Sequence, residues 1–271
     1  MAFAICSLNS GSNGNCYYIA VKDEAILVDA GLSCRETEKR MKRQGLSMDK
    51  VKALFVSHEH TDHIKGIAGI AKKYKIPVYI TPNTYRNSGL QLDESLIQGF
   101  TAYQSITIGS LSITAFPKFH DAADPHSFVI AYKDKKVGVF TDIGISCEHV
   151  IENFQQCNAV FLEANYDDEM LDKGRYPYFL KNRIRGGRGH LSNSQALKLF
   201  LDFRSEKLSH LLLSHLSKDN NCPDLVFRTF NEYSRNTRII VASRYEESEV
   251  YYLEEALEVE RVRAVQLEIG F

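Results

Sequence analysis

The chain has 271 residues, of which 44% are hydrophobic and 25% are charged, so it can bury the core of an ordinary globular protein. Its formal net charge of −1 excludes binding to polyanions through bulk charge, so any nucleic-acid affinity must come from a local patch. The sequence has neither an apolar run of the roughly 18–20 residues that span a bilayer nor a signal-peptide pattern. We therefore expect a cytoplasmic protein with no membrane partner.

The first half of the chain is predicted to alternate strands and helices. Ser33 followed by Glu36 is a capping-box pattern that opens a helix to about Gln44, and Gly45 stops it. A second helix is expected from about residue 63 to 74. The strands are apolar runs bounded by turn-forming residues, and they span residues 3–8, 16–21, 25–29, 51–56 and 77–80.

The second half is predicted to begin with several short β runs over residues 97–141. Helices are expected at 146–156 and 192–203, and further strands at 158–163, 208–214 and 238–242. Residues 246–271, with an alternating stretch at 262–267, have the pattern of an extra strand or a tail. No linker or repeat divides the chain. Residues 1–271 are therefore predicted to form one α/β domain, an αββα sandwich of two mixed β-sheets flanked by helices.

The most informative segment is His58-Glu59-His60-Thr61-Asp62-His63, directly after the apolar strand 51–56. Imidazole nitrogens and carboxylate oxygens are ligands for zinc and its neighbours in the periodic table. Because alternate residues of an extended chain point the same way, His58 and His60 can bind one ion, and Asp62 and His63 turn toward a second position. The cluster therefore predicts a metal-binding active site. The six cysteines form no C-x-x-C pair and are expected to be free, mostly buried thiols.

Three further predicted strands are each followed by a histidine or an aspartate, at the end where ligands gather in open sheets. These residues are His120, Asp142 and His215, and His190 stands separately before Leu191-Ser192-Asn193. A lone histidine after a strand is more often structural, so the argument rests on their combination with the cluster. The remaining histidines lack this context and are expected to be structural or surface residues; they are His126, His149 and His210.

These motifs resemble the metallo-β-lactamase fold superfamily over nearly the whole chain. The resemblance is carried by Leu27-Val28-Asp29-Ala30-Gly31, the H-x-H-x-D-H box, His120, Thr141-Asp142 and Leu213-Ser214-His215. Residues 8–15, 119–125, 162–165 and 189–193 are similar to the YycJ/WalJ subgroup, whose members are regarded as DNA-processing exonucleases. One departure is Tyr166, where the subgroup often has histidine, but this is not a metal-ligand position.

The resemblance implies two divalent metal ions, Zn²⁺ and/or Mn²⁺, with a bridging hydroxide between them as nucleophile. It assigns His58, His60 and His120 to the first ion. It assigns Asp62, His63 and His215 to the second ion, and Asp142 bridges the two. Asp29 either orients a ligand histidine through its other ring nitrogen or forms the turn before Ala30-Gly31.

The candidate catalytic residues are His190, Asp62 and Glu163. The resemblance implies that His190 protonates the leaving oxygen, with Glu163 as its orienting partner. The fold alone does not choose between lactams, lactones, thioesters and phosphodiesters. A capping-box pattern at Ser192 and Gln195 favours phosphate, because free N–H groups at a helix start attract anions.

A second feature that favours phosphate is the run 173–188, which holds six basic residues and no acidic one. Aromatic residues are interleaved with them, so the run either follows a nucleic-acid backbone or forms a solvated helix face. The 47 residues between Asp142 and His190 leave no room for a β-CASP insertion. The candidate nucleic-acid contacts are Arg175, Lys181, Arg183, Arg185, Arg188 and Asn193.

The leading hypothesis is a metal-dependent phosphodiesterase, specifically a 5′–3′ DNA exonuclease with a dinuclear centre and nucleic acid as its partner. One alternative is an RNA-processing nuclease. Another is a small-molecule metallo-hydrolase acting on a lactone, thioester or cyclic phosphodiester. A non-catalytic nucleic-acid-binding module is disfavoured by the complete set of candidate ligands. Whether the chain forms a homodimer is left open.

Overall fold

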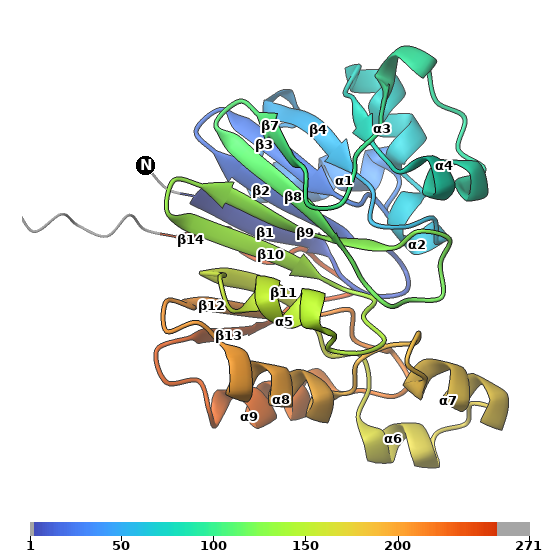
Figure 1. The fold of residues 1–271 in the computed structure, drawn as a ribbon, viewed down its shortest axis with the longest axis vertical. Coiled ribbons are helices and arrows are strands. Elements are labelled where there is room, and N and C mark those ends of the chain that lie inside the picture. Colours follow the sequence, from blue (N-terminus) through green and yellow to red (C-terminus); the bar gives the residue numbers. More distant parts are fainter. Residues whose placement is uncertain (1–2, 254–271) are drawn as a thin grey trace, which may run out of the picture.

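Two seven-stranded β-sheets lie face to face at the centre of the protein, and helices cover their outer faces (Figure 1). The structure, a computed structural model, describes residues 3–253. One sheet has the strand order β14-β1-β2-β3-β4-β5-β6, and the other has the order β13-β12-β11-β10-β9-β8-β7. This arrangement confirms the predicted αββα sandwich.

The first sheet is antiparallel from β14 to β3 and parallel from β3 to β6. Strand β14 shows that part of the segment 246–271 adds a strand to this sheet, whereas residues 262–267 lie outside the described residues. The strands are β1 (Phe3–Asn9), β2 (Cys16–Val21), β3 (Glu24–Val28), β4 (Val51–Phe55), β5 (Val78–Tyr79), β6 (Ile97–Gln98) and β14 (Tyr251–Leu253).

The second sheet begins with an antiparallel meander, β7 to β10, and continues with parallel strands from β10 to β13. Both sheets are therefore mixed, as predicted. The strands are β7 (Ser105–Ile108), β8 (Leu111–Pro117), β9 (His126–Tyr132), β10 (Lys135–Phe140), β11 (Ala159–Glu163), β12 (His210–Ser214) and β13 (Arg238–Val241).

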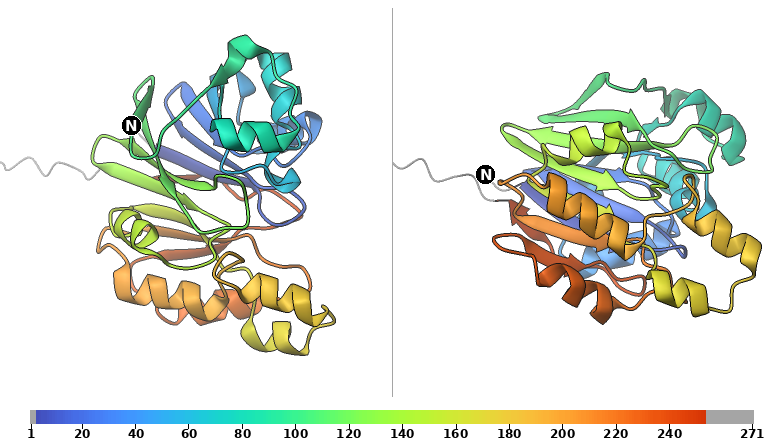
Figure 2. Two further views of the ribbon diagram at one scale, coloured as in Figure 1. Left: turned by 45° about the vertical axis from the view of Figure 1, so that its right-hand side comes forward. Right: turned by 60° about the horizontal axis from the view of Figure 1, so that its bottom comes forward.

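Helices of the first half pack on the first sheet, and most of those in the second half pack on the second sheet. Helices α6 and α7 instead lie at the side of the molecule where α2 follows β4 (Figure 2). The helices are α1 (Cys34–Arg43), α2 (Thr61–Ile64), α3 (Ile67–Tyr74), α4 (Pro82–Ser88), α5 (Glu148–Phe154), α6 (Asp168–Lys173), α7 (Tyr178–Arg185), α8 (Asn193–Phe203) and α9 (Pro223–Asn231). Within residues 3–253, no helix is long and apolar enough to cross a membrane.

The prediction of a single helix from residue 63 to 74 is wrong, because the chain forms two helices, α2 and α3, that meet at Gly66. The Gly66 N–H donates to the Ala30 carbonyl at 2.7 Å. A Cβ at Gly66 would lie only 2.0 Å from the Leu32 carbonyl oxygen. The interruption therefore lets α2 and α3 approach the loop after β3 more closely than a residue with a side chain would allow.

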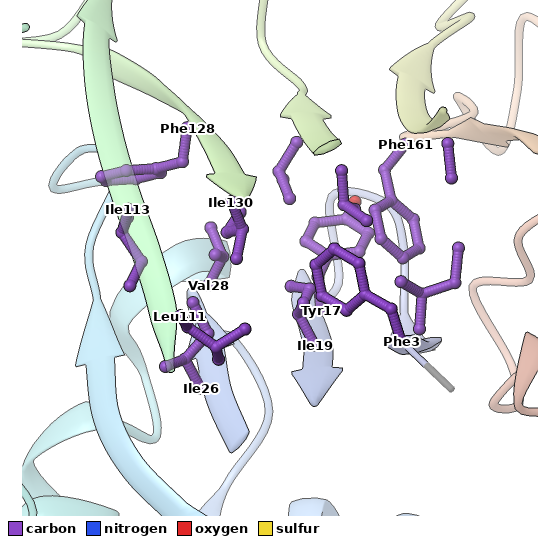
Figure 3. Close-up of a cluster of buried hydrophobic side chains, with 14 of the residues drawn as sticks. Phe3, Tyr17, Ile19, Ile26, Val28, Leu111, Ile113, Phe128, Ile130 and Phe161 are labelled. Atoms are coloured by element: carbon purple, nitrogen blue, oxygen red, sulfur yellow. The ribbon is translucent and has the colours of Figure 1, made fainter. Parts of the chain in front are cut away.

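The core between the sheets explains why the strands have nearly continuous apolar sequences. Along β2, Tyr17 and Ile19 point into the inter-sheet core, and Tyr18 packs in a separate core beneath the helices. Both faces of the strand are thus buried. Figure 3 shows the inter-sheet core, which includes Phe3, Ile26, Val28, Leu111, Ile113, Phe128, Ile130 and Phe161.

Candidate metal centre

The predicted metal ligands gather at one edge of the sandwich, where β4, β8, β10 and β12 end. His58, His120, Asp142 and His215 follow these four strands. Parallel and antiparallel strands of two different sheets deliver them to one place, and loops position them further. The structure brings all seven predicted ligands into groups whose ligand atoms lie within 4.8 Å of one another.

The first group contains three imidazole nitrogens that converge on one point. Nδ1 of His60 lies 3.1 Å from Nε2 of His58 and 3.3 Å from Nε2 of His120. Two nitrogens bound to a tetrahedral zinc ion, with bonds of about 2.0–2.1 Å, lie about 3.3–3.4 Å apart. The spacing of this group therefore fits one ion with a fourth position left for water or substrate.

The second group is built around Asp62 and shares Asp142 with the first. Oδ2 of Asp62 lies 3.4 Å from Nε2 of His215 and 3.5 Å from Nε2 of His63. The two oxygens of Asp142 lie 3.0 Å from Nε2 of His63 and 3.8 Å from Nε2 of His120. Asp142 is thus in reach of both groups, as a bridging ligand would be.

The chemistry of Asp142 fits a site for divalent cations. Its side chain is 2% exposed, and its Oδ2 atom accepts no well-aligned hydrogen bond, although Nε2 of His63 lies 3.0 Å away. A buried carboxylate oxygen is costly unless a cation or a hydrogen bond compensates it. The seven ligands together offer imidazoles and carboxylates without a thiolate, which suits a catalytic rather than a structural zinc site.

Asp29 contacts two of the predicted ligand histidines, His63 directly and His58 through the Ser57 hydroxyl. Its Oδ2 lies 2.7 Å from Nδ1 of His63 and 2.8 Å from the Ser57 hydroxyl, which in turn lies 2.8 Å from Nδ1 of His58. These contacts fix which ring nitrogen faces the candidate metal positions. Asp29 also has a φ of 60° in the turn after β3, so its geometry is compatible with both interpretations of this residue.

Three residues of the site have left-handed backbone conformations at or near strand ends. The φ angles are 60° for Asp29, 53° for Asp142 and 57° for His215. Aspartate and histidine adopt this region more readily than β-branched residues do, although it still costs free energy. Such strain is concentrated at functional sites, and here it turns the chain where the sheet meets the ligand cluster.

The electrostatics of the cluster divide its histidines into two classes. Burial, with His63 and Lys118 nearby, holds the pKa of His58 well below its usual value, and burial lowers the pKa of His120 to about 4. Burial also disfavours the charged form of His63, but surrounding carboxylates, led by Asp142, outweigh it and raise the pKa to about 10. The neutral histidines are ready to bind a cation, whereas His63 must release a proton first.

The pKa of Asp142 is held well below its usual value. Burial alone would raise it, but the neighbouring His215 and His63 outweigh that effect. Burial alone would lower the pKa of His215, but Asp142, Asp62 and Glu163 together outweigh it and raise the pKa well above its usual value. The buried carboxylates therefore stay ionised and available as ligands across the neutral range.

Residues 24–215 match the family described as the Beta-lactamase superfamily domain. The chain belongs to this family. It is 35% identical over 223 residues to the exodeoxyribonuclease YycJ of Bacillus anthracis, and the alignment covers 80% of this chain and 84% of that relative. It is also 31% identical over 234 residues to the exodeoxyribonuclease WalJ of Streptococcus pneumoniae, and that alignment covers 84% of this chain and 87% of WalJ.

The metallo-β-lactamase fold protein YhfI from Bacillus subtilis has a similar structure. It superposes with a TM-score of 0.72 at 16% identity and covers 93% of this chain and 100% of its own. The family match and the relatives confirm the resemblance that the motifs indicated, and the structural similarity confirms the predicted fold. Together with the ligand cluster, membership of the superfamily identifies the chain as a metal-dependent hydrolase, as predicted.

His190 and Glu163 lie together beside the ligands of this superfamily member. Nδ1 of His190 lies 2.8 Å from Oε1 of Glu163 and 3.6 Å from Oδ1 of Asp142. Glu163, at the end of β11, is fully buried and also accepts hydrogen bonds from the backbone N–H groups of Ile143 and Leu191. Burial would raise the Glu163 pKa, but His190 and other donors lower it to about 2.

We predict that Glu163→Gln lowers kcat by about 10- to 100-fold, the range for residues that orient metal-site groups. The glutamine amide would carry no charge, and its NH₂ group cannot accept the bonds that the carboxylate accepts from His190, His215 and the backbone. Steady-state kinetics would measure the loss. Glu152→Gln, on the exposed face of α5, is the matched control. Unchanged kcat in the Glu163 variant would contradict the orienting role.

Most of the backbone N–H groups at the start of α8 already have hydrogen-bond partners within the protein. The capping box forms, so Ser192 Oγ accepts from the Gln195 N–H, and Gln195 Oε1 accepts from the Ser192 N–H. The Asn193 N–H donates to the Tyr166 carbonyl at 2.7 Å. Because these three donors are occupied within the protein, this helix start is less favourable for an anion than the sequence pattern indicates.

Asn193 does not fit a nucleic-acid contact either. Its side chain is 4% exposed and exchanges hydrogen bonds with the side chain of Asn221, at 3.0 and 2.9 Å. Asn221 also donates to the Ala164 and Asn165 carbonyls. Asn193 is therefore a structural residue that joins α8 to the loops after β11 and β12.

The basic run 173–188 begins at the last residue of α6, continues through α7 and its flanking loops, and carries exposed aromatic residues. The exposed fractions of Tyr178 and Phe179 are 80% and 74%. Some charges are paired: Arg183 with Asp121 at 2.5 Å, Arg185 with Asp172, while Lys181 donates to the Asp172 carbonyl. Within residues 3–253, no ion pair involves the two remaining predicted contacts, Arg175 and Arg188.

The residues that sequence reasoning left outside the site lie in structural positions. His126 packs against Phe100, His149 contacts Tyr103, and His210 packs against Tyr251. Tyr166 is buried and forms a β-bridge with Ser192. All six cysteines are free; Cys6, Cys16 and Cys157 are buried, Cys34, Cys147 and Cys222 are partly exposed, and none belongs to the ligand groups.

Proposed function

We propose that the chain is a metal-dependent exonuclease that hydrolyses phosphodiesters in DNA and uses two divalent ions. The observation that carries the proposal is the position of Asp142, between two groups of ligands and 3.6 Å from His190. Relatives named as exodeoxyribonucleases match over most of their length and support DNA as the substrate. The 5′–3′ direction rests on the resemblance to that subgroup alone.

The bound ions would supply Lewis acidity and a nucleophile at neutral pH. His58, His60 and His120 would hold one ion, and Asp62, His63 and His215 the other. His190, in its charged form, would donate its Nε2 proton to the leaving oxygen. Its Nδ1–H would meanwhile donate to Glu163, whose negative charge stabilises the imidazolium and fixes the ring.

A cleavage panel on end-labelled substrates tests the proposal. Single- and double-stranded DNA and RNA, labelled at either end, would be incubated with protein loaded with Zn²⁺ or Mn²⁺. We expect mononucleotides from the 5′ end of DNA, and no products after chelation. Full DNA cleavage by metal-stripped protein would overturn metal dependence. Cleavage of RNA alone would favour an RNA-processing nuclease, and turnover of lactones or thioesters alone would favour a small-molecule hydrolase.

We predict that His190→Gln lowers kcat on DNA by about 10²- to 10³-fold, because a general acid contributes on this scale. Metal content should stay close to that of the unmodified protein, since the seven ligands remain. Product formation and bound metal would be measured on the same samples. His210→Gln, at the opposite end of the sheets, is the control. Equal loss of metal and activity in the His190 variant would indicate a ligand rather than an acid.

A further inference from the structure

A cavity of about 330 Å³ lies beside the candidate metal centre and is not used by the steps above. Its wall includes His120, a predicted ligand, so the cavity adjoins the reacting position. The loop 117–125 after β8 forms most of the wall, and His149 of α5 and Arg188 complete it. Pockets that hold small ligands usually occupy about 300–1,000 Å³, so this volume suits one nucleotide and not an oligonucleotide.

Hydrogen bonds hold the walls of the cavity in place. The Lys118 N–H donates to the Pro125 carbonyl at 3.1 Å and closes the loop at its neck. The Ala123 N–H donates to Oε1 of Glu59, the residue between His58 and His60. The loop is therefore anchored to the ligand box itself, and the cavity is formed before any ligand binds.

The backbone below Arg188 is also fixed by close packing. A Cβ at Gly144 would lie 2.3 Å from the Gly187 carbonyl oxygen and 2.7 Å from Cα of Arg188. The Gly144 N–H donates to the Phe119 carbonyl at 2.7 Å. The loop after β10 thus joins the two segments that carry Phe119 and Arg188, so the backbone at both residues has a fixed place at the cavity wall.

The lining combines an aromatic face with positive charge. The Phe119 ring is 44% exposed, although it stands among buried residues. Arg188 is exposed and makes no ion pair with any residue from 3 to 253. Lys118 is buried and its ammonium group donates to the Thr141 carbonyl at 2.7 Å, so Arg188 is the exposed cation of the lining. Asp124 is the one carboxylate of the lining.

We propose that this cavity binds a single nucleotide of the DNA strand, the one next to the scissile phosphate. Its base would stack on the Phe119 ring, and Arg188 would pair with its phosphate. Stacking on a ring accepts every base, as an enzyme that degrades any sequence requires. This inference rests on the proposed function, and it predicts that the free mononucleotide competes with DNA.

Binding of 2′-deoxyadenosine 5′-monophosphate (dAMP) to the metal-loaded full chain tests the inference. Calorimetry should show that Phe119→Ala and Arg188→Ala each raise the Kd for dAMP about tenfold. Phe119→Ala should leave the Kd for inorganic phosphate unchanged, because phosphate has no base to stack. Phe227→Ala and Arg228→Ala, on the exposed face of α9, are matched controls, since Phe227 is 40% exposed. Melting curves would verify that all four variants fold.

The outcomes separate the two proposals. If the protein cleaves DNA but neither cavity variant changes dAMP binding, the cavity assignment is overturned and the proposed function stands. If Phe119→Ala weakens dAMP and inorganic phosphate equally, stacking is overturned. If dAMP binds through Phe119 and Arg188 in a protein that cleaves no DNA, the cavity is supported as a nucleotide site, whereas the proposed nuclease function fails.

Discussion

Replacing Asp142 with asparagine should abolish hydrolysis and strip the protein of its metal, with a loss of kcat on the order of 10³-fold or more. Its carboxylate oxygens lie 3.0 Å from His63, 3.5 Å from His215 and 3.8 Å from His120, so they are within reach of both predicted ligand groups. Asparagine keeps the size of the side chain but removes the charge, and its NH₂ group cannot bind a cation.

Metal content by elemental analysis and turnover on labelled DNA would be measured on the same preparation. Asp134→Asn is the matched control, because this carboxylate lies in the exposed turn between β9 and β10 and pairs only with Lys135 at 3.4 Å among the described residues. Circular dichroism would show that both variants fold. An Asp142 variant that retains its metal and half of its turnover would contradict the bridging role.

The sequence was most informative where local pattern and chemistry coincide. The H-x-H-x-D-H box sits within six consecutive positions, and the apolar strands before it and before His120, Asp142 and His215 are continuous enough to locate their carboxyl ends. Because parallel strands of one sheet end at a common edge, strand positions favour convergence of these side chains, and the packing of the two sheets completes it. The box and the sandwich could therefore be predicted together.

Several short helices were missed because their signals are weak. Helices α4 and α9 begin at Pro82 and Pro223, and proline in the first helical turn is a recognised start signal that was not used. Helices α6 and α7 have six and eight residues, which is too short for a clear periodic pattern. Their place beside the metal edge depends on tertiary packing, which propensity does not encode.

Other features of the site depend on contacts between distant segments. The capping box at Ser192 was predicted correctly, but a sequence pattern cannot show that the same bonds occupy the N–H groups proposed for an anion. Asn193 is buried because Asn221, 28 residues away, meets it in space. The left-handed conformations of Asp142 and His215 likewise depend on where the strands stop. These properties are consequences of the assembled fold.

Gly31→Ala should lower the free energy of unfolding by about 3 kcal/mol and weaken metal binding by about 10- to 100-fold. Both effects are expected although Gly31 is not itself a predicted metal ligand. A Cβ at Gly31 would lie 1.7 Å from the Asp62 carbonyl oxygen and 2.6 Å from the Asn15 nitrogen. The same carbonyl accepts from the Asn15 N–H at 2.7 Å, and the Gly31 N–H donates to the Asn15 carbonyl at 2.8 Å. The added methyl must therefore move the backbone that carries Asp62.

Urea unfolding with and without metal, together with metal titration, would separate the two effects. Gly99→Ala is the matched control, since a Cβ there meets no atom within 4 Å and should leave both stability and metal binding unchanged. Wild-type metal affinity in the Gly31 variant would show that the loop around residue 31 accommodates the methyl group without displacing Asp62. The expected result instead gives a physical reason for glycine in Leu27-Val28-Asp29-Ala30-Gly31: only a residue without a side chain lets three segments cross directly beneath the ligands of the second group.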